Sequence, residues 1–169
     1  MRQIGIEPSR VIAPDVLENV LPGELPRAYA QRMALEKLLP QEDAFVIAAD
    51  TVVAVGRRIL HKTDSKDVAE RYIRLLSGRR HRVYSAVAVC APNGKIAFRV
   101  VESIVGFARL GEPQLQSYLA SHEWQGKAGA YAIQGLAARY IDYLGGSYSG
   151  VVGLPLHETH KLLLGLGWQ

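Results

Sequence analysis

The chain has 169 residues and a mass of 18.6 kDa, with 49% hydrophobic and 21% charged residues. This length predicts a single domain, residues 1–169, and the composition excludes disordered, collagenous and fibrous proteins. No apolar run approaches the ~20 residues that a transmembrane helix needs, and the first residues lack the apolar stretch of a signal peptide. Cys90 is the only cysteine, which excludes an internal disulfide and makes a reducing cytoplasm the expected compartment.

The net charge is +4 and the sequence pI is about 9.3, a balance compatible with an anionic partner. The one dense basic run is Arg79-Arg80-His81-Arg82. A nucleic-acid-binding surface would be expected to carry a stripe of basic residues interleaved with aromatic ones, and the sequence has no such stripe. We therefore expect a small phosphorylated ligand as the partner, and neither nucleic acid nor a membrane.

The first 25 residues are rich in proline and glutamate and are expected to form loops. Pro26 suits the first turn of a helix, and the helix formers of Arg27 to Leu39 continue it up to Pro40. One face of this helix would carry three apolar residues and a lysine, namely Ala30, Met33, Ala34 and Lys37. The lysine is either a side chain that snorkels at the helix end or a functional group.

The most apolar run, Phe45 to Val55, is rich in β-branched residues and predicts a buried strand or a bulged strand pair that Gly56 closes. A helix is expected from Asp64 to Leu76, with Thr63 or Asp64 as its cap and Gly78 as its stop.

Two strand-like runs follow, Val83 to Ala91 and Lys95 to Leu110, and Pro92-Asn93-Gly94 between them predicts a hairpin. The remaining expected elements are a short helix over Pro113–Ala120, a loop over Trp124–Tyr131, a β segment over Ala132–Leu144, a turn over Gly145–Ser147 and a last helix from Pro155 to Leu164. Strands and helices mix along the chain, which predicts an α/β domain with a mixed β-sheet and flanking helices.

Asp50 lies in the middle of the apolar run, where a carboxylate is costly unless it is paired, hydrogen-bonded or bound to a metal. It is either a strand-end aspartate that hydrogen-bonds a turn or a carboxylate that faces a metal or activates water at the edge of a cleft. We favour the second interpretation.

Three lysines lie next to glycines, turns or helix ends, and each by itself is typical of a solvated surface charge: Lys37, Lys62 and Lys127. Together with Asp50 and Glu18 they indicate polyphosphate chemistry, because lysines neutralise phosphate charge while carboxylates hold Mg²⁺ and position water. The Lys127 segment is not a P-loop, since its Gly-Lys pair is followed by alanine.

The sequence resembles the Maf family, the septum-formation-inhibitor homologues that act as nucleoside triphosphate pyrophosphatases. The resemblance runs from Met1 to the C-terminus and rests on several segments in family order: Ala49–Val53, Leu60–Lys62, Leu76–Val83, Lys127–Gly135, Gly146–Tyr148 and Val151–Pro155.

The resemblance implies a hydrolase acting on acid anhydrides, which splits a nucleoside triphosphate into a monophosphate and diphosphate with Mg²⁺ or another divalent cation such as Mn²⁺. It implies that Asp50 is the proton acceptor, that Glu18 and Asp50 hold the metal, and that Lys37, Lys62 and Lys127 bind phosphate. It further implies that Thr51 and Gln134 discriminate between bases, with a preference for dTTP and UTP. The implied fold has two lobes around a central cleft, and family members often form homodimers.

Family members open with a strand and a Ser-x-Ser-Pro-Arg-Arg segment that contributes an arginine to the substrate site. This chain starts beyond that segment, so we expect the domain to be truncated at its N-terminus. The alternative function is therefore a nucleotide-binding or division-associated protein with little or no turnover.

Overall fold

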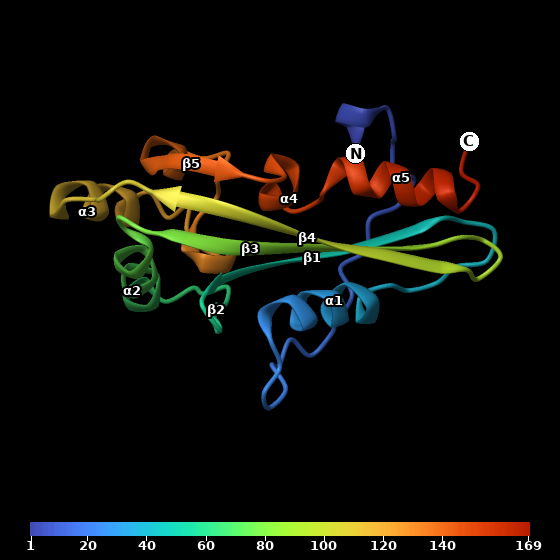
Figure 1. The fold of residues 1–169 in the computed structure, drawn as a ribbon, viewed down its shortest axis with the longest axis horizontal. Coiled ribbons are helices and arrows are strands. Elements are labelled where there is room, and N and C mark those ends of the chain that lie inside the picture. The colour runs from blue at the N-terminus through green and yellow to red at the C-terminus, as the bar shows by residue number, and fades with distance from the viewer.

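Five strands form one sheet in the order β2-β1-β3-β4-β5, and every neighbouring pair is antiparallel. This computed structural model describes all residues 1–169 and places the strands at β1 (Val46–Val55), β2 (Arg58–Leu60), β3 (Arg80–Cys90), β4 (Ile96–Phe107) and β5 (Ile141–Gly145). The strands β1, β3 and β4 run most of the length of the molecule (Figure 1). The predicted mixed sheet is therefore wrong, because no two neighbouring strands are parallel. The connection through α2 takes the chain from β2 past β1, and β3 then pairs with β1 in the antiparallel direction.

Helices flank this sheet, which confirms the α/β class. The helices are α1 (Pro26–Glu36), α2 (Lys66–Leu76), α3 (Glu112–Ala120), α4 (Tyr148–Val152) and α5 (Leu156–Gly165), with short 3₁₀ turns η1 (Arg2–Ile4), η2 (Ala128–Ala130) and η3 (Leu136–Tyr140). Figure 1 shows α1 against one face of the long strands and α5 against the other, while α2 and α3 lie at the opposite end. None of these helices has the length and apolar character needed to cross a membrane.

The helix α1 lies close to the sheet because the strands present small side chains to it. Alternate residues of β1 and β3 point to one face, and the buried residues there include four alanines: Ala48, Ala54, Ala86 and Ala88. Met33, which is fully buried, packs into this face from α1 and contributes about 1.5–3 kcal/mol on the usual scale for buried apolar side chains. This packing directs the C-terminal end of α1 towards the middle of β1.

The two ends of the sheet carry separate apolar cores, as two lobes require. One core surrounds α2, α3 and the 3₁₀ turns η2 and η3 and includes Trp124 and Tyr131. The other end is covered by α1 on one face and on the other by α5, whose Leu162 and Leu163 pack against Val87 and Val89. The middle of β1 lies where these cores meet.

The expected β segment over Ala132–Leu144 was wrong up to Tyr140, because the chain makes a turn and then the 3₁₀ turn η3 before β5 begins at Ile141. Short apolar runs fit a helical period as well as a strand, and a local turn decides here: the amide of Gly135 donates to the carbonyl of Ala132. The cap of α2 is Ser65, because the Thr63 hydroxyl accepts from the Ser65 amide and delays the helix. The strand β2 and the helix α4 were not predicted.

Candidate active site

A cleft of about 230 Å³ opens at the edge of the sheet beside the middle of β1. The strand β2 pairs with β1 only from Val53 to Val55, so the edge of β1 at Asp50 and Thr51 is not covered by a neighbouring strand. Six of the seven candidate residues line this cleft: Lys37, Asp50, Thr51, Lys62, Lys127 and Gln134. Glu18, the seventh, contacts two of those six, Lys37 and Lys62.

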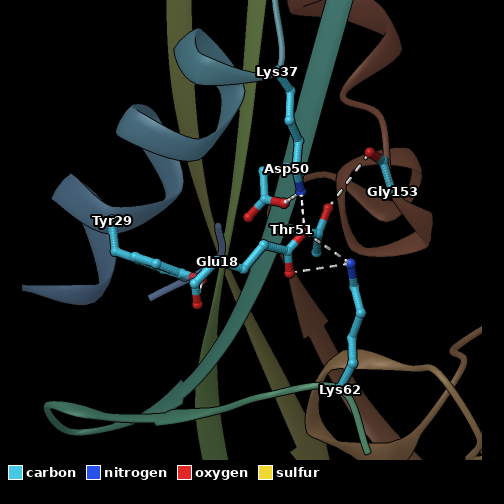
Figure 2. A network of polar contacts seen from close by, with 7 residues as sticks. All are labelled: Glu18, Tyr29, Lys37, Asp50, Thr51, Lys62 and Gly153. Carbon is cyan, nitrogen blue, oxygen red and sulfur yellow. Dashed lines mark hydrogen bonds and ion pairs between the residues drawn. The ribbon is translucent and has the colours of Figure 1, made fainter. Parts of the chain in front are cut away.

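The centre of the cleft is a network of two carboxylates and two lysines, drawn in Figure 2. The ammonium group of Lys37 lies between the two carboxylates, 2.5 Å from Asp50 Oδ1 and 2.5 Å from Glu18 Oε1. Lys37 directly follows α1 and continues its apolar stripe, so the helix face that packs on β1 also aims this lysine at Asp50. The Lys62 Nζ atom lies 3.4 Å from Glu18 Oε1 and is more exposed.

Burial governs the electrostatics of Asp50. Its side chain is 8% exposed, and burial raises the pKa of its carboxyl above the usual value although the Lys37 ammonium acts in the opposite direction. Burial also opposes the charge of Lys37, but its hydrogen bonds to Asp50 and Glu18 prevail and raise the pKa of Lys37. Asp50 is therefore a buried carboxylate with increased basicity, held by one ammonium group.

Glu18 reaches the cleft from the segment before α1, which has no regular secondary structure at this point. Tyr29 of α1 donates from its hydroxyl to the Glu18 carbonyl at 3.0 Å, and Arg32 donates to the Asn19 carbonyl at 2.7 Å. Partial burial would raise the pKa of the Glu18 carboxyl, but hydrogen bonding to Lys37 and the charge of Lys62 lower it below the usual value. Glu18 is thus an ionised carboxylate that α1 holds in place.

Two loops that bring the other lysines are joined to each other. Lys62 follows β2, and Lys127 precedes η2. The Gly126 amide donates to the carbonyl of Thr63 at 3.2 Å, and the Lys127 amide donates to the carbonyl of Trp124, whose ring is buried. Three cationic side chains from separate elements therefore border the cleft near one buried carboxylate, an arrangement that suits a polyphosphate chain.

Thr51 and Gln134 line the same cleft from different elements. Thr51 points away from the face that carries Asp50, since successive strand residues alternate, and its hydroxyl lies 3.4 Å from the carbonyl of Gly153 (Figure 2). Gln134 is exposed near the end of a loop that packs tightly on β1: a Cβ atom at Gly129, where φ is +68°, would lie 2.7 Å from Val53.

The sequence interpretation did not assign a role to two parts of the cleft wall. Tyr131 lines the cleft, and its hydroxyl lies 2.8 Å from Nε2 of the buried His81. Residues 151–153 form another wall, and the buried Ser85 hydroxyl holds α4 there through the Gly150 carbonyl at 2.6 Å. A signal for this wall was present, because Val151–Pro155 was one of the segments that carry the resemblance.

Comparison with known proteins gives the chain a family. A family model described as Maf-like protein matches residues 1–166. The chain belongs to the Maf family. A protein of Anaplasma phagocytophilum named nucleoside triphosphate pyrophosphatase is 50% identical, over 98% of this chain and 88% of its own length. A protein of Maricaulis maris named dTTP/UTP pyrophosphatase is 51% identical, over 97% of this chain and 80% of its own length. A protein of Chelativorans sp. with the same name is 49% identical, over 100% of this chain and 86% of its own length.

The donor atoms of this Maf-family cleft are suitable for a hard divalent cation. Mg²⁺ is held in proteins by one or two carboxylates together with substrate phosphates, and the carboxylates of Glu18 and Asp50 converge on one point. The ammonium group of Lys37 lies at that point. A cation at these carboxylates would require the Lys37 ammonium to move aside, which its flexible stem permits.

Proposed function

We propose that this chain hydrolyses nucleoside triphosphates to the monophosphate and diphosphate. The observation that carries the proposal is the placement of Asp50, a buried carboxylate beside three lysines at the open edge of β1. The names of relatives about 50% identical over nearly the whole chain support the same reaction.

In this reaction Asp50 accepts a proton from a water molecule as the water oxygen attacks the α-phosphorus. The bond between that phosphorus and the oxygen bridging to the β-phosphate breaks, and diphosphate leaves with the bonding electrons. The raised pKa of Asp50 makes it a stronger base than a surface aspartate. The lysines Lys37, Lys62 and Lys127 neutralise the charge that develops on the phosphate oxygens.

Glu18 and Asp50 would hold the Mg²⁺ or Mn²⁺ ion. When bound, such an ion supplies positive charge to the phosphate oxygens. The carboxylate of Glu18 is the more exposed of the two, at 38% against 8%, so it can turn with least cost to meet a cation. Its contacts with Lys37 and Lys62 keep it ionised for that role.

Thr51 and Gln134 discriminate between bases, with dTTP and UTP preferred. A glutamine amide offers both donors and an acceptor, so it can match the edge of a pyrimidine. The relatives in Maricaulis maris and Chelativorans sp. bear the name dTTP/UTP pyrophosphatase, which supports this preference over other triphosphates.

The proposal extends to a cytoplasmic homodimer. The lone cysteine, Cys90, is buried and unpaired, as is usual for proteins of reducing compartments. Large apolar side chains at Val11, Leu17 and Leu21 are exposed and are candidates for contact with a second copy. Light scattering of the purified protein tests this: a mass of one chain at micromolar concentration contradicts the dimer.

The deciding experiment measures diphosphate release from dTTP, UTP, ATP and GTP with and without Mg²⁺. We expect release in the presence of the cation, and we expect Asp50→Asn to lower kcat at least about 100-fold, the usual contribution of a general base, while nucleotide binding persists. Binding in a calorimeter without any release would favour the alternative of a nucleotide-binding protein without turnover. Full activity of Asp50→Asn would show that another group accepts the proton.

A further inference from the structure

Gln134 lies at the end of its loop, immediately before the chain turns into η3. The turn is closed by the Gly135 amide, which donates to the carbonyl of Ala132 at 3.0 Å. Gln134 itself is exposed at the cleft. The position of its side chain therefore depends on how firmly the backbone that follows it is held. Whatever fixes Gly135 and Leu136 therefore fixes the position of the Gln134 amide.

The carboxylate of Glu123 lies directly against this turn. Its Oε2 atom accepts a hydrogen bond of 2.6 Å from the amide of Leu136, the first residue of η3. A Cβ atom at Gly135 would collide with the same oxygen, so glycine leaves the room that the carboxylate occupies. The amides at the start of a helical turn have no partner within it, and a carboxylate is a strong acceptor for one of them.

Glu123 is held independently of the loop that it supports. The hydroxyl of Ser121 accepts from the Glu123 amide at 3.3 Å and donates to the carbonyl of Tyr118 in α3. The next residue, Trp124, is 2% exposed, and its ring nitrogen donates to the Leu119 carbonyl at 2.9 Å. The end of α3 is thus anchored in the larger core and gives Glu123 a fixed base.

Glu123 does not line the cleft, so it has no direct part in proton transfer or phosphate binding. The lysine at the other end of the loop has its own support, because the Lys127 amide bonds to Trp124 and the Gly126 amide bonds to Thr63. Loss of the Glu123 contact therefore frees the Gln134 end of the loop while the phosphate-binding end stays in place.

We propose that Glu123 is a positioning residue for base recognition, which fixes the side chain of Gln134 through the turn at Gly135 and Leu136. The inference rests on the proposed role of Gln134 in reading the base and adds the residue that makes that reading selective. It concerns selectivity between bases and leaves the hydrolytic step unchanged.

The test compares Glu123→Ala, Glu123→Gln and Gly135→Ala with Gln134→Ala, and uses Glu112→Gln, at an exposed glutamate that begins α3, as a matched control. The selectivity is the ratio of kcat/KM for UTP to that for ATP, and the ratio of dissociation constants for the same nucleotides gives a readout that needs no turnover. Loss of one hydrogen bond to the base corresponds to a change of about tenfold.

We expect Glu123→Ala and Gly135→Ala to lower the ratio about tenfold through KM, with kcat nearly unchanged. Glu123→Gln retains an acceptor oxygen and should have a smaller effect, which also serves as the readout if the alanine variant does not fold. Glu112→Gln should leave the ratio unchanged. The double variant Glu123→Ala/Gln134→Ala should fall no further than Gln134→Ala, since both substitutions remove the same contact.

Two outcomes overturn the inference in different ways. If Gln134→Ala lowers the ratio and the Glu123 variants do not, or if the two effects add in the double variant, then Glu123 does not act through Gln134 and the proposed function stands. If Gln134→Ala itself leaves the ratio unchanged, then the proposed base-recognition role is wrong and the inference falls with it.

Discussion

Acidification should destabilise this protein through His81, an imidazole buried beside the cleft. The side chain is 3% exposed, its Nε2 atom lies 2.8 Å from the Tyr131 hydroxyl, and Nδ1 has no partner. The rings of Phe107 and Tyr131 pack against it. Burial lowers the pKa of His81 from 6.5 to about 4, so the folded protein keeps a neutral ring in weakly acidic solution.

The unfolded chain protonates this imidazole as the pH falls through 6.5, whereas the folded chain does so only near pH 4. Between pH 6.5 and about 4 the unfolded state therefore binds one more proton than the folded state. The contribution of His81 to the free energy of unfolding is fully present above pH 6.5 and is lost as the pH falls through this range. At about 1.4 kcal/mol per pH unit, the fall in pKa from 6.5 to about 4 corresponds to a total loss of about 3 kcal/mol. About 2 kcal/mol of this is lost by pH 5.

Urea denaturation at pH 7.5, 6 and 5 measures the loss in the wild type and in His81→Gln, whose amide retains a hydrogen-bonding group towards Tyr131. The difference between the two proteins isolates His81, because every other titrating group is common to both. The exposed His157 supplies a matched control in His157→Gln, which should follow the wild type. Equal pH dependence of stability in wild type and His81→Gln would falsify the assignment.

Three further substitutions test the packing around the cleft. Gly129→Ala should cost about 2–3 kcal/mol, because it combines a left-handed backbone with a contact of 2.7 Å to Val53, whereas Gly126→Ala has open space and should cost about 1 kcal/mol in urea denaturation; equal costs would contradict this. Lys37→Met should cost about 3 kcal/mol of stability, because it leaves Asp50 buried without its partner. Lys62→Met, at a half-exposed site, should change stability by less than about 0.5 kcal/mol, and the reverse order would contradict the assignment of Lys37 as the buried partner. Ser85→Ala should cost about 1–2 kcal/mol in thermal unfolding and weaken nucleotide binding in calorimetry, because the carbonyl of Gly150 loses its donor and α4 lines the cleft; unchanged stability would show that α4 is held by other contacts.

Local signals in the sequence were sufficient for most elements. Pro26 marks the start of α1 as predicted, the apolar run ending at Val55 is one strand, and the turn at Pro92-Asn93-Gly94 joins β3 to β4. These features depend on proline, on glycine with positive φ and on β-branched residues, whose preferences act within a few positions. The segment over Ala132–Leu144 failed because its apolar spacing suits two structures. The local turn from Ala132 to Gly135 selects one of them, and the carboxylate of Glu123 supports it by accepting a hydrogen bond from the Leu136 amide.

The candidate site shows the same division. Asp50 was recognisable from the cost of a carboxylate within an apolar run, and Lys37 from its place on the stripe of α1. Tyr131 and residues 151–153 lie in segments that carry the resemblance, but the sequence did not show that they line the same cleft as Asp50. Such proximity is long-range: Thr51 and Gly153, which are in contact, lie 102 positions apart.

The sequence by itself determined an α/β domain, a buried carboxylate, three candidate lysines and, by resemblance, membership of the Maf family. Tertiary structure alone decided that every strand pair is antiparallel and that Lys37 lies between Asp50 and Glu18. It also decided that the pairing of β2 along β1 stops short of Asp50, which leaves a cleft there. The reason is physical: hydrophobic pattern and turn chemistry act over a few residues, whereas the position of a charge relative to its partners is set by how α1, β1 and the loops pack together.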